Sequence, residues 1–152
     1  MRGCIPVYRD TITLFNRKSG GRGQGDTWLP TVIENVNLTV DRAAIMAKYG
    51  QESQDSAVLH IRYEKDGDQI MVAGKPWSNP KEWDGTEDAI TFASGNGFDF
   101  FWEGRWDGSI VTDEQYGDEG FYNYMNRTHD HVFAVTAVAK YGLIPHFEIM
   151  GK

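Results

Sequence analysis

The sequence predicts a mainly β protein, a small antiparallel β-barrel or sandwich with one or two short helical segments and long loops. Three observations predict it: polar and apolar residues alternate in several segments, 17 of the 152 residues are Gly, and aromatic residues make up 13%. Aromatic residues favour strands, and Gly favours the tight turns that join them. A chain of this length is normally one domain, so we expect residues 1–152 to form a single β-rich domain.

The segment from His131 onward shows the strongest β pattern. It predicts two strands folded about Tyr141 and Gly142, with both faces of the stretch from Val132 to Ala139 largely apolar. A strand that is apolar on both faces must be covered on both. We therefore expect this strand at the centre of the barrel or sandwich.

Two strands are predicted near the start of the chain. Asp10–Phe15 alternates polar and apolar residues with Ile12 and Leu14 on one face, which predicts a half-buried strand. Thr27–Val40 is also β-like, and Pro30 within it indicates an edge position or a bulge.

The middle of the chain predicts two hairpins. Ala57–Glu64 has the cleanest alternation, and Asp66-Gly67 is a strong hairpin signal between it and the strand Gln69–Ala73. Ala89–Ser94 and Phe98–Glu103 are expected to pair with each other across the intervening glycines.

The remaining segments connect these strands. Residues 41–56 are polar enough for an exposed excursion, and residues 74–120 form a loop-rich segment with many aromatic and acidic residues. Phe121–Arg127 fits one or two helical turns, in which Phe121 and Met125, spaced i, i+4, face the sheet.

A glycine-rich loop is expected at residues 16–26, where four glycines and the three cations Arg17, Lys18 and Arg22 offer nothing to bury. The loop lacks the Gly-Lys-Ser/Thr ending of a phosphate-binding loop, and a strand follows it rather than a helix. We expect a mobile, solvated hairpin loop; the alternative hypothesis is that Arg17, Lys18 and Arg22 touch nucleic acid or an acidic partner surface.

Four tryptophans are candidate site residues: Trp83, Trp102 and Trp106 lie among acidic residues, and Trp77 precedes them in the loop-rich segment. Such surfaces occur in sugar-binding and glycosidase clefts, although a glycosidase needs two carboxylates held opposite each other, which sequence cannot show. Tryptophans are more often core or interface residues. We therefore expect these four at an interface, and a carbohydrate or peptide groove is the alternative.

The strongest metal candidate is the triplet His129-Asp130-His131. On an extended chain only the two histidines share a face, and His60 and His146 join them only if the fold brings those strands together. We prefer to interpret the triplet as polar residues that introduce a buried strand. We predict no metal, no cofactor and no catalytic residues, because the chain has no Gly-x-Ser-x-Gly or His-Glu-x-x-His motif.

Composition limits the other functions. A net charge of −7 argues against a duplex-binding surface, and no apolar run approaches the roughly 20 residues that span a bilayer. Cys4 is the single cysteine, so an intrachain disulfide is impossible and folding inside a cell is expected.

The order of the segments adds a resemblance to a known family. An Ile-Thr-Leu strand, a Gly-rich loop and a Thr-Trp strand open the chain, two further strands follow, and a hairpin closes it. These segments are residues 10–17, 26–32, 58–63, 69–74, 133–138 and 145–152. Together they resemble the head-closure (stopper) proteins of the bacteriophage head–tail joining group. Residues 41–55 and 77–120 make this chain longer than the shorter members.

The resemblance implies a structural virion protein, not an enzyme. Such proteins form a homo-oligomeric ring between the portal or adaptor and the tail; they help close the DNA-filled head and dock the tail. Expected partners are the portal, adaptor and tail-completion proteins, with packaged DNA touched only weakly in passing and no membrane. The subunit folds in the host cytoplasm and ends in the virion neck. On this interpretation Arg17, Lys18 and Arg22 face the DNA lumen or a neighbouring subunit, and the four tryptophans form interfaces.

The alternative function is a monomeric β-sandwich binding module for carbohydrate or peptide, with the tryptophans lining its groove. A third hypothesis is a metal-dependent hydrolase built on His129 and His131.

Overall fold

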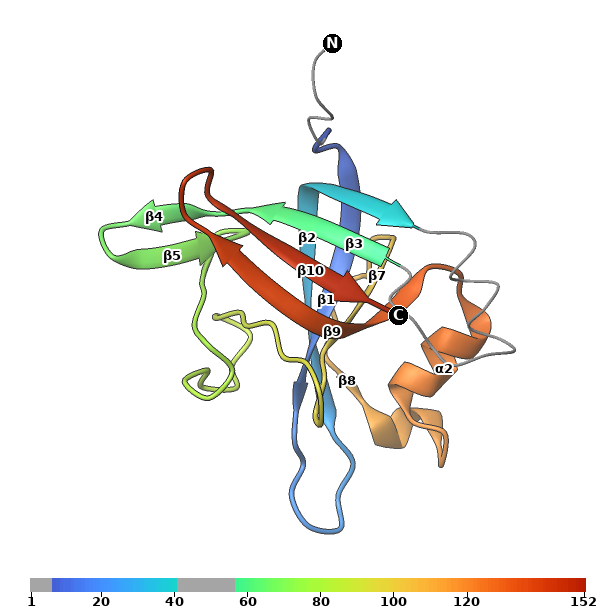
Figure 1. Ribbon diagram of the computed structural model, residues 1–152. Helices are drawn as coiled ribbons and strands as arrows, with labels where there is room; N and C mark the ends of the chain where they lie inside the picture. Colours follow the sequence, from blue (N-terminus) through green and yellow to red (C-terminus); the bar gives the residue numbers. More distant parts are fainter. Residues whose placement is uncertain (1–6, 41–56) are drawn as a thin grey trace.

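The computed structural model describes residues 7–40 and 57–152 and confirms a mainly β fold, in the form of a closed antiparallel barrel (Figure 1). The described strands of the barrel follow the order β1-β7-β9-β10-β3-β2, and β2 pairs back with β1. Their bounds are β1 Asp10–Lys18, β2 Thr27–Val40, β3 Ala57–Arg62, β7 Phe100–Trp102, β9 Val132–Tyr141 and β10 His146–Gly151.

The long strand β2 closes the barrel because it is bent. Its first part pairs with β1 through Ile33 and again at Val36, and its last part, Asn37–Val40, pairs with β3. The register with β1 shifts between Ile33 and Val36, and Asn35 there has a positive φ of 58°, a conformation that Asn tolerates better than most residues. Pro30 lies where β2 pairs with β1 alone, so the predicted edge-like position is confirmed.

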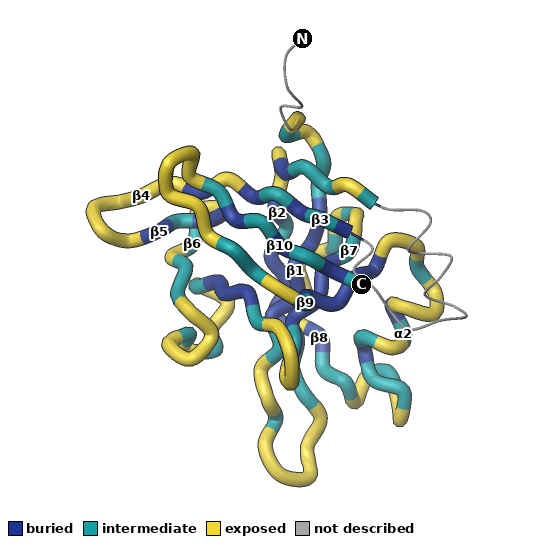
Figure 2. Tube along the Cα trace, in the orientation of Figure 1, coloured by how far each residue is buried: buried dark blue, intermediate teal, exposed yellow. Residues whose placement is uncertain are grey.

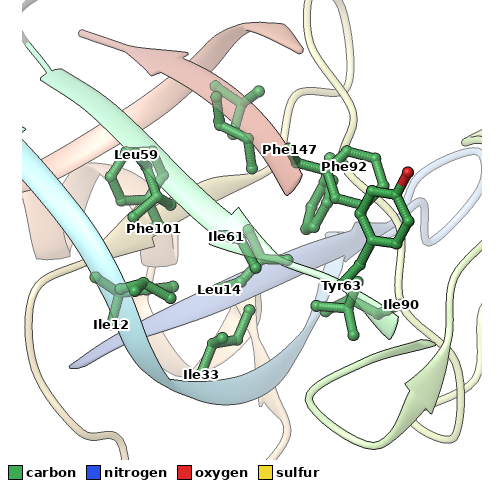
Figure 3. Packing of buried hydrophobic residues seen from close by; sticks show 14 of the residues in the cluster. Ile12, Leu14, Ile33, Leu59, Ile61, Tyr63, Ile90, Phe92, Phe101 and Phe147 are labelled. Carbon is green, nitrogen blue, oxygen red and sulfur yellow. The ribbon is translucent and has the colours of Figure 1, made fainter. Parts of the chain in front are cut away.

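The barrel interior is filled by apolar side chains from every wall. Ile12, Leu14, Ile33, Leu59, Ile61, Phe101 and Phe147 belong to one buried cluster, and several meet at the barrel centre in Figure 3. In β3 the buried residues alternate with more exposed ones, as predicted, and Leu59 and Ile61 face the core.

A second apolar cluster covers the outside of β1. Helix α2 (Phe121–Thr128) inserts Phe121 and Met125 against Phe15 and Phe100, which confirms the predicted helical turns. The prediction that β1 is half-buried is wrong, because this cluster buries Phe15 on the outer face as completely as Leu14 is buried inside.

The cluster is fixed by one carboxylate. Asp113, at the start of the 3-10 helix η1 (Asp113–Tyr116), accepts hydrogen bonds from the Trp28 indole N–H at 2.7 Å and from the Phe121 backbone N–H at 3.0 Å. A single acidic side chain therefore joins a barrel strand to the first turn of the helix.

The closing hairpin forms as predicted, with β9 paired to β10. Val132–Val135 is buried on both faces, but the strand becomes partly exposed from Thr136 onward. The expectation of two covered faces is therefore confirmed for the first half of β9 only. The second half runs beyond the covering segments toward the exposed tip at Leu143 and Ile144 (Figure 2).

The predicted hairpin between residues 89–94 and 98–103 is wrong. Residues 91–94 form no strand, and Ile90 makes only an isolated bridge to Trp77. β7 pairs instead with β1 and β9, so part of the expected 74–120 insertion is a wall of the barrel. The Ala93 N–H, which a hairpin ladder would use, donates to the Asp99 carboxylate at 2.8 Å.

A small sheet extends from the barrel. It consists of β4 (Glu64–Asp66), β5 (Gln69–Val72) and β6 (Lys75–Pro76), and β4 continues from β3 after one residue, so the hairpin projects sideways (Figure 1). Gly67, with a φ of 63°, makes the tight turn predicted for Asp66-Gly67. The remaining short strand, β8 (Val111–Thr112), pairs with the start of β2. The expected excursion at residues 41–56 lies outside the described residues.

Gly151 provides a test of the barrel packing. A Cβ at this position would lie 2.8 Å from the Cβ of Phe133 and 3.1 Å from the Phe101 ring. We expect Gly151→Ala to lower the free energy of unfolding by roughly 1–3 kcal/mol, measured by denaturant titration.

Gly142, in the turn of the same hairpin, is the matched control. A Cβ there would meet nothing within 4 Å, so Gly142→Ala should change stability by about 0.5 kcal/mol or less. Equal effects of the two substitutions would contradict the close packing around Gly151.

Candidate functional site

The glycine-rich loop is shorter than predicted, because β1 continues through Lys18. Arg17 pairs with Trp28 and Lys18 with Thr27, so both cations belong to a strand rather than to a loop. The prediction that Arg17 and Lys18 lie in a loop is therefore wrong. Arg22 does lie in the exposed connection between β1 and β2.

The Arg17 guanidinium is also engaged within the chain. It lies between the rings of Trp28 and Phe98, 4.6 and 4.5 Å from their centres, and 3.4 Å from the Asp26 carboxylate. Lys18 and Arg22 are exposed. Of the three cations predicted to contact DNA or a neighbouring subunit, only Lys18 and Arg22 are therefore exposed to solvent.

The four tryptophans separate into two pairs. Trp102 and Trp106 pack edge to face, 6.3 Å between ring centres, in the cluster around α2. Trp77 and Trp83 instead line a pocket beside β9. Each ring is partly buried, and the structure does not bring the four into one groove.

The structure does not bring the four histidines together. His131 contacts Glu103 at 2.6 Å, and His129 lies beside Trp102, whereas His60 and His146 face each other on β3 and β10. Among residues 7–40 and 57–152, no group of three or more His, Cys, Asp or Glu side chains is placed to hold a metal ion.

Asp99 is a buried carboxyl that sequence reasoning missed. One oxygen accepts the Arg17 backbone N–H at 2.8 Å; the other accepts the Asn16 side-chain amide at 2.9 Å and the Ala93 N–H. Burial raises the pKa of Asp99 to about 7, against these hydrogen bonds and the Arg17 charge, which lower it. The available signal was a lone acid within the aromatic run Phe98-Asp99-Phe100-Phe101.

Asp99 lies at a pocket of about 550 Å³ that is bounded by β9, the end of β1 and residues 77–97. Trp77, Trp83, Phe92 and Phe147 provide its apolar walls, and Arg17, Lys81 and Lys140 provide cations. The pocket therefore combines aromatic surface with positive charge.

The tip of the β9–β10 hairpin forms a different surface. Leu143 is 98% exposed and Ile144 70% exposed. A groove of about 950 Å³ lies beside the tip and is lined by Ile144, Pro145, Tyr63, Met71 and Arg105, among others. An apolar projection thus adjoins a concave surface.

In the described part of the chain, no helix is both long enough and apolar enough to cross a membrane.

The contacts of Arg17 can be tested against those of Arg22. Arg17→Ala should lower the free energy of unfolding by roughly 1–3 kcal/mol, since it removes two cation–π contacts and buried side-chain packing. Arg22→Ala, at an exposed position, should change it by about 0.5 kcal/mol or less. Thermal and denaturant unfolding measure both; an Arg17 variant as stable as the Arg22 variant would contradict the packing described.

Asp99 predicts a pH dependence. Since its pKa is raised from 3.8 to about 7 in the folded state, the folded protein holds a proton that the unfolded chain releases. This contribution to stability is fully present below pH 3.8, falls as the pH rises, and is lost above about 7.

The matched variant is Asp99→Asn, which cannot titrate. At pH 5 its free energy of unfolding should be lower than that of the unsubstituted protein. This difference, measured by denaturant titration, should shrink as the pH is raised from about 5 to 8. Burial lowers the pKa of His60, which gives stability lost on acidification, but His60 is present in both proteins and cancels in the difference. A constant difference across this range would show that Asp99 does not titrate there.

Comparison with known proteins gives a family. No curated protein and no solved structure is similar enough to this chain to match it. A family model described as a family of unknown function (DUF6751) matches residues 7–152. Because this match spans nearly the whole sequence, the chain belongs to the DUF6751 family.

Proposed function

We propose that this protein is a structural virion protein of the phage head–tail connector. It forms a ring between the portal or adaptor and the tail, helps close the DNA-filled head, and docks the tail. The observation that carries the proposal is the exposed apolar tip of the β9–β10 hairpin, at Leu143 and Ile144. The sequence resemblance supplies the virion setting, and the small closed barrel is the fold that this resemblance implies.

The tip has the properties of a contact element. Contiguous exposed apolar side chains on a soluble protein mark interaction sites, and covering Leu143 and Ile144 would contribute roughly 1.5–3 kcal/mol each. A projection and a groove on one molecule suit a heterologous contact, in which the tip of one copy meets the groove of the next. Such a contact closes a ring when the rotation that relates neighbouring copies closes after a full turn.

Two further hairpins project from the barrel. The β1–β2 connection extends from one end and the β4–β5 hairpin extends from the side, both exposed at their tips (Figures 1 and 2). A rigid barrel with projections in several directions can contact neighbours beside, above and below it. Lys18 and Arg22 lie at or near the β1–β2 tip, where they can reach a neighbour or the lumen.

The overall charge fits a channel through which DNA moves. Neutralising phosphates with Lys and Arg is what holds DNA on a protein, and this chain carries a net charge of −7. A ring of such subunits would bind packaged DNA weakly and let it slide.

The second candidate is a monomeric binding module for carbohydrate or peptide. It is favoured by the pocket that holds Trp77 and Trp83, and it requires no assembly. The two candidates differ in what they predict for purified protein mixed with portal rings.

The decisive experiment is cryo-electron microscopy of virions that carry this chain, or of portal rings mixed with it. We expect a symmetric ring stacked below the portal, with the β9–β10 tip at the contact between neighbours.

Leu143→Asp combined with Ile144→Asp should weaken ring assembly at least about tenfold, because each substitution places a charge where an apolar contact forms.

Ile110→Asp is the matched control. Ile110 is also an exposed apolar residue, at 42%, but it lies on the segment that leads into β8. It should leave assembly unchanged. A monomer that never binds portal rings, together with virions that lack the chain, would overturn the proposal.

A further inference from the structure

We propose that the pocket beside β9 binds a carboxylate carried on a flat apolar body, the chemistry of an aromatic acid. The proposal concerns the pocket of about 550 Å³ lined by Trp77, Thr91, Arg17 and Lys140. It does not depend on ring assembly and holds equally for a single subunit.

The apolar half of the pocket is a set of packed rings. Trp77 lies 4.8 Å from Phe147 and 6.2 Å from Phe92, and the two phenylalanines are 4.9 Å apart between ring centres. Phe92 and Phe147 lie side by side at one end of the barrel core in Figure 3. The volume lies within the range of small-molecule sites, and aromatic walls suit a flat ligand.

Three residues that line the pocket each carry a buried side-chain atom without a hydrogen-bond partner. Within the described chain, the buried side-chain atoms that lack a partner include the Trp77 indole N–H, the Arg17 Nε–H and the Thr91 hydroxyl. All three residues line this pocket, and Thr91 is only 1% exposed. A buried unpaired polar group costs roughly 1–3 kcal/mol, so native proteins keep few of them. Two of these atoms, the Trp77 and Arg17 nitrogens, can only donate.

The charges around the pocket favour an anion. Arg17, Lys81 and Lys140 line it, and the Lys140 ammonium lies 5.9 Å from the centre of the Trp77 ring. Asp99 is the one acidic residue among the lining residues, and its two oxygens already accept three hydrogen bonds. Arg17 already has Asp26 at 3.4 Å, so the excess positive charge at the pocket comes from Lys81 and Lys140.

Other ligand classes fit less well. A cationic ligand would need a free carboxylate, but the oxygens of Asp99 are occupied by donors from Asn16, Arg17 and Ala93. A neutral sugar would not use the charges of Lys81 and Lys140. A carboxylate supplies acceptors and negative charge together, and an attached ring fills the aromatic half.

The same chemistry has two sources, a free aromatic acid or an acidic residue beside an aromatic one in a peptide. The test is an NMR titration of the ¹⁵N-labelled full chain, which follows the Trp77 indole N–H signal. The probes are indole-3-acetate, its neutral amide indole-3-acetamide, and the peptide acetyl-Trp-Glu-amide. We expect the Trp77 signal to shift with the acetate, the peptide or both, and the amide to bind at least about fivefold more weakly than the acetate.

Variants separate the site from general charge effects. Lys81→Gln and Lys140→Gln change exposed side chains that line the pocket, and each should weaken binding of the charged probes about threefold. Lys65→Gln, exposed on β4 and outside the pocket, is the control and should bind like the unsubstituted protein. The remaining amide signals report whether each variant is folded.

Each outcome decides the proposal. A shift with the peptide alone supports the site and identifies a protein source, and a shift with indole-3-acetate alone identifies a small molecule. No shift of the Trp77 signal with either charged probe overturns the proposal. Equal binding of acetate and amide, or equal weakening by Lys65→Gln, also overturns it, since the pocket would then not select a carboxylate.

Discussion

The closed barrel depends on one strand serving two neighbours. β2 pairs with β1 along its first part and with β3 along its last, and the irregularity around Asn35 turns it from one to the other. A straight β2 would leave β1 and β3 as open edges of a flat sheet, and edges of this kind invite pairing with other chains. The position of the β9–β10 tip and the shape of the pocket both follow from this closure.

Asp99 has a comparable role on a smaller scale. By accepting donors from Asn16, Arg17 and Ala93 it holds the irregular segment 91–98 against β1. The segment therefore contributes side chains to a pocket instead of a strand to the wall. Natural proteins break local rules mainly where function requires it, and a buried carboxyl beside unpaired donors is such a break.

Local patterns predicted much of the fold, because their causes are local. The alternation in β3, the Asp66-Gly67 turn, the closing hairpin and the Phe121–Met125 spacing all needed only neighbouring residues. The failures involve distant partners: β7 pairs with β1 across the chain, and the outer face of β1 is buried by a helix far along the sequence. Arg17 looked like a loop cation because nothing nearby shows that Phe98 covers it. The pocket was not predictable for the same reason, since its walls come from four separated segments.

The placement of the C-terminal hairpin has a consequence for folding order. β9 and β10 fill the gap between β7 and β3, and Lys152 exchanges two backbone hydrogen bonds with Ala134. Until residues from Val132 onward are synthesised, β7 and β3 each have one edge without a paired strand, and the core is uncovered. Contacts between such distant segments form slowly, because the chain must first close long loops. During that interval a nascent chain can pair wrongly with other copies of itself, so the rate at which β9 and β10 dock limits how fast correctly folded copies accumulate.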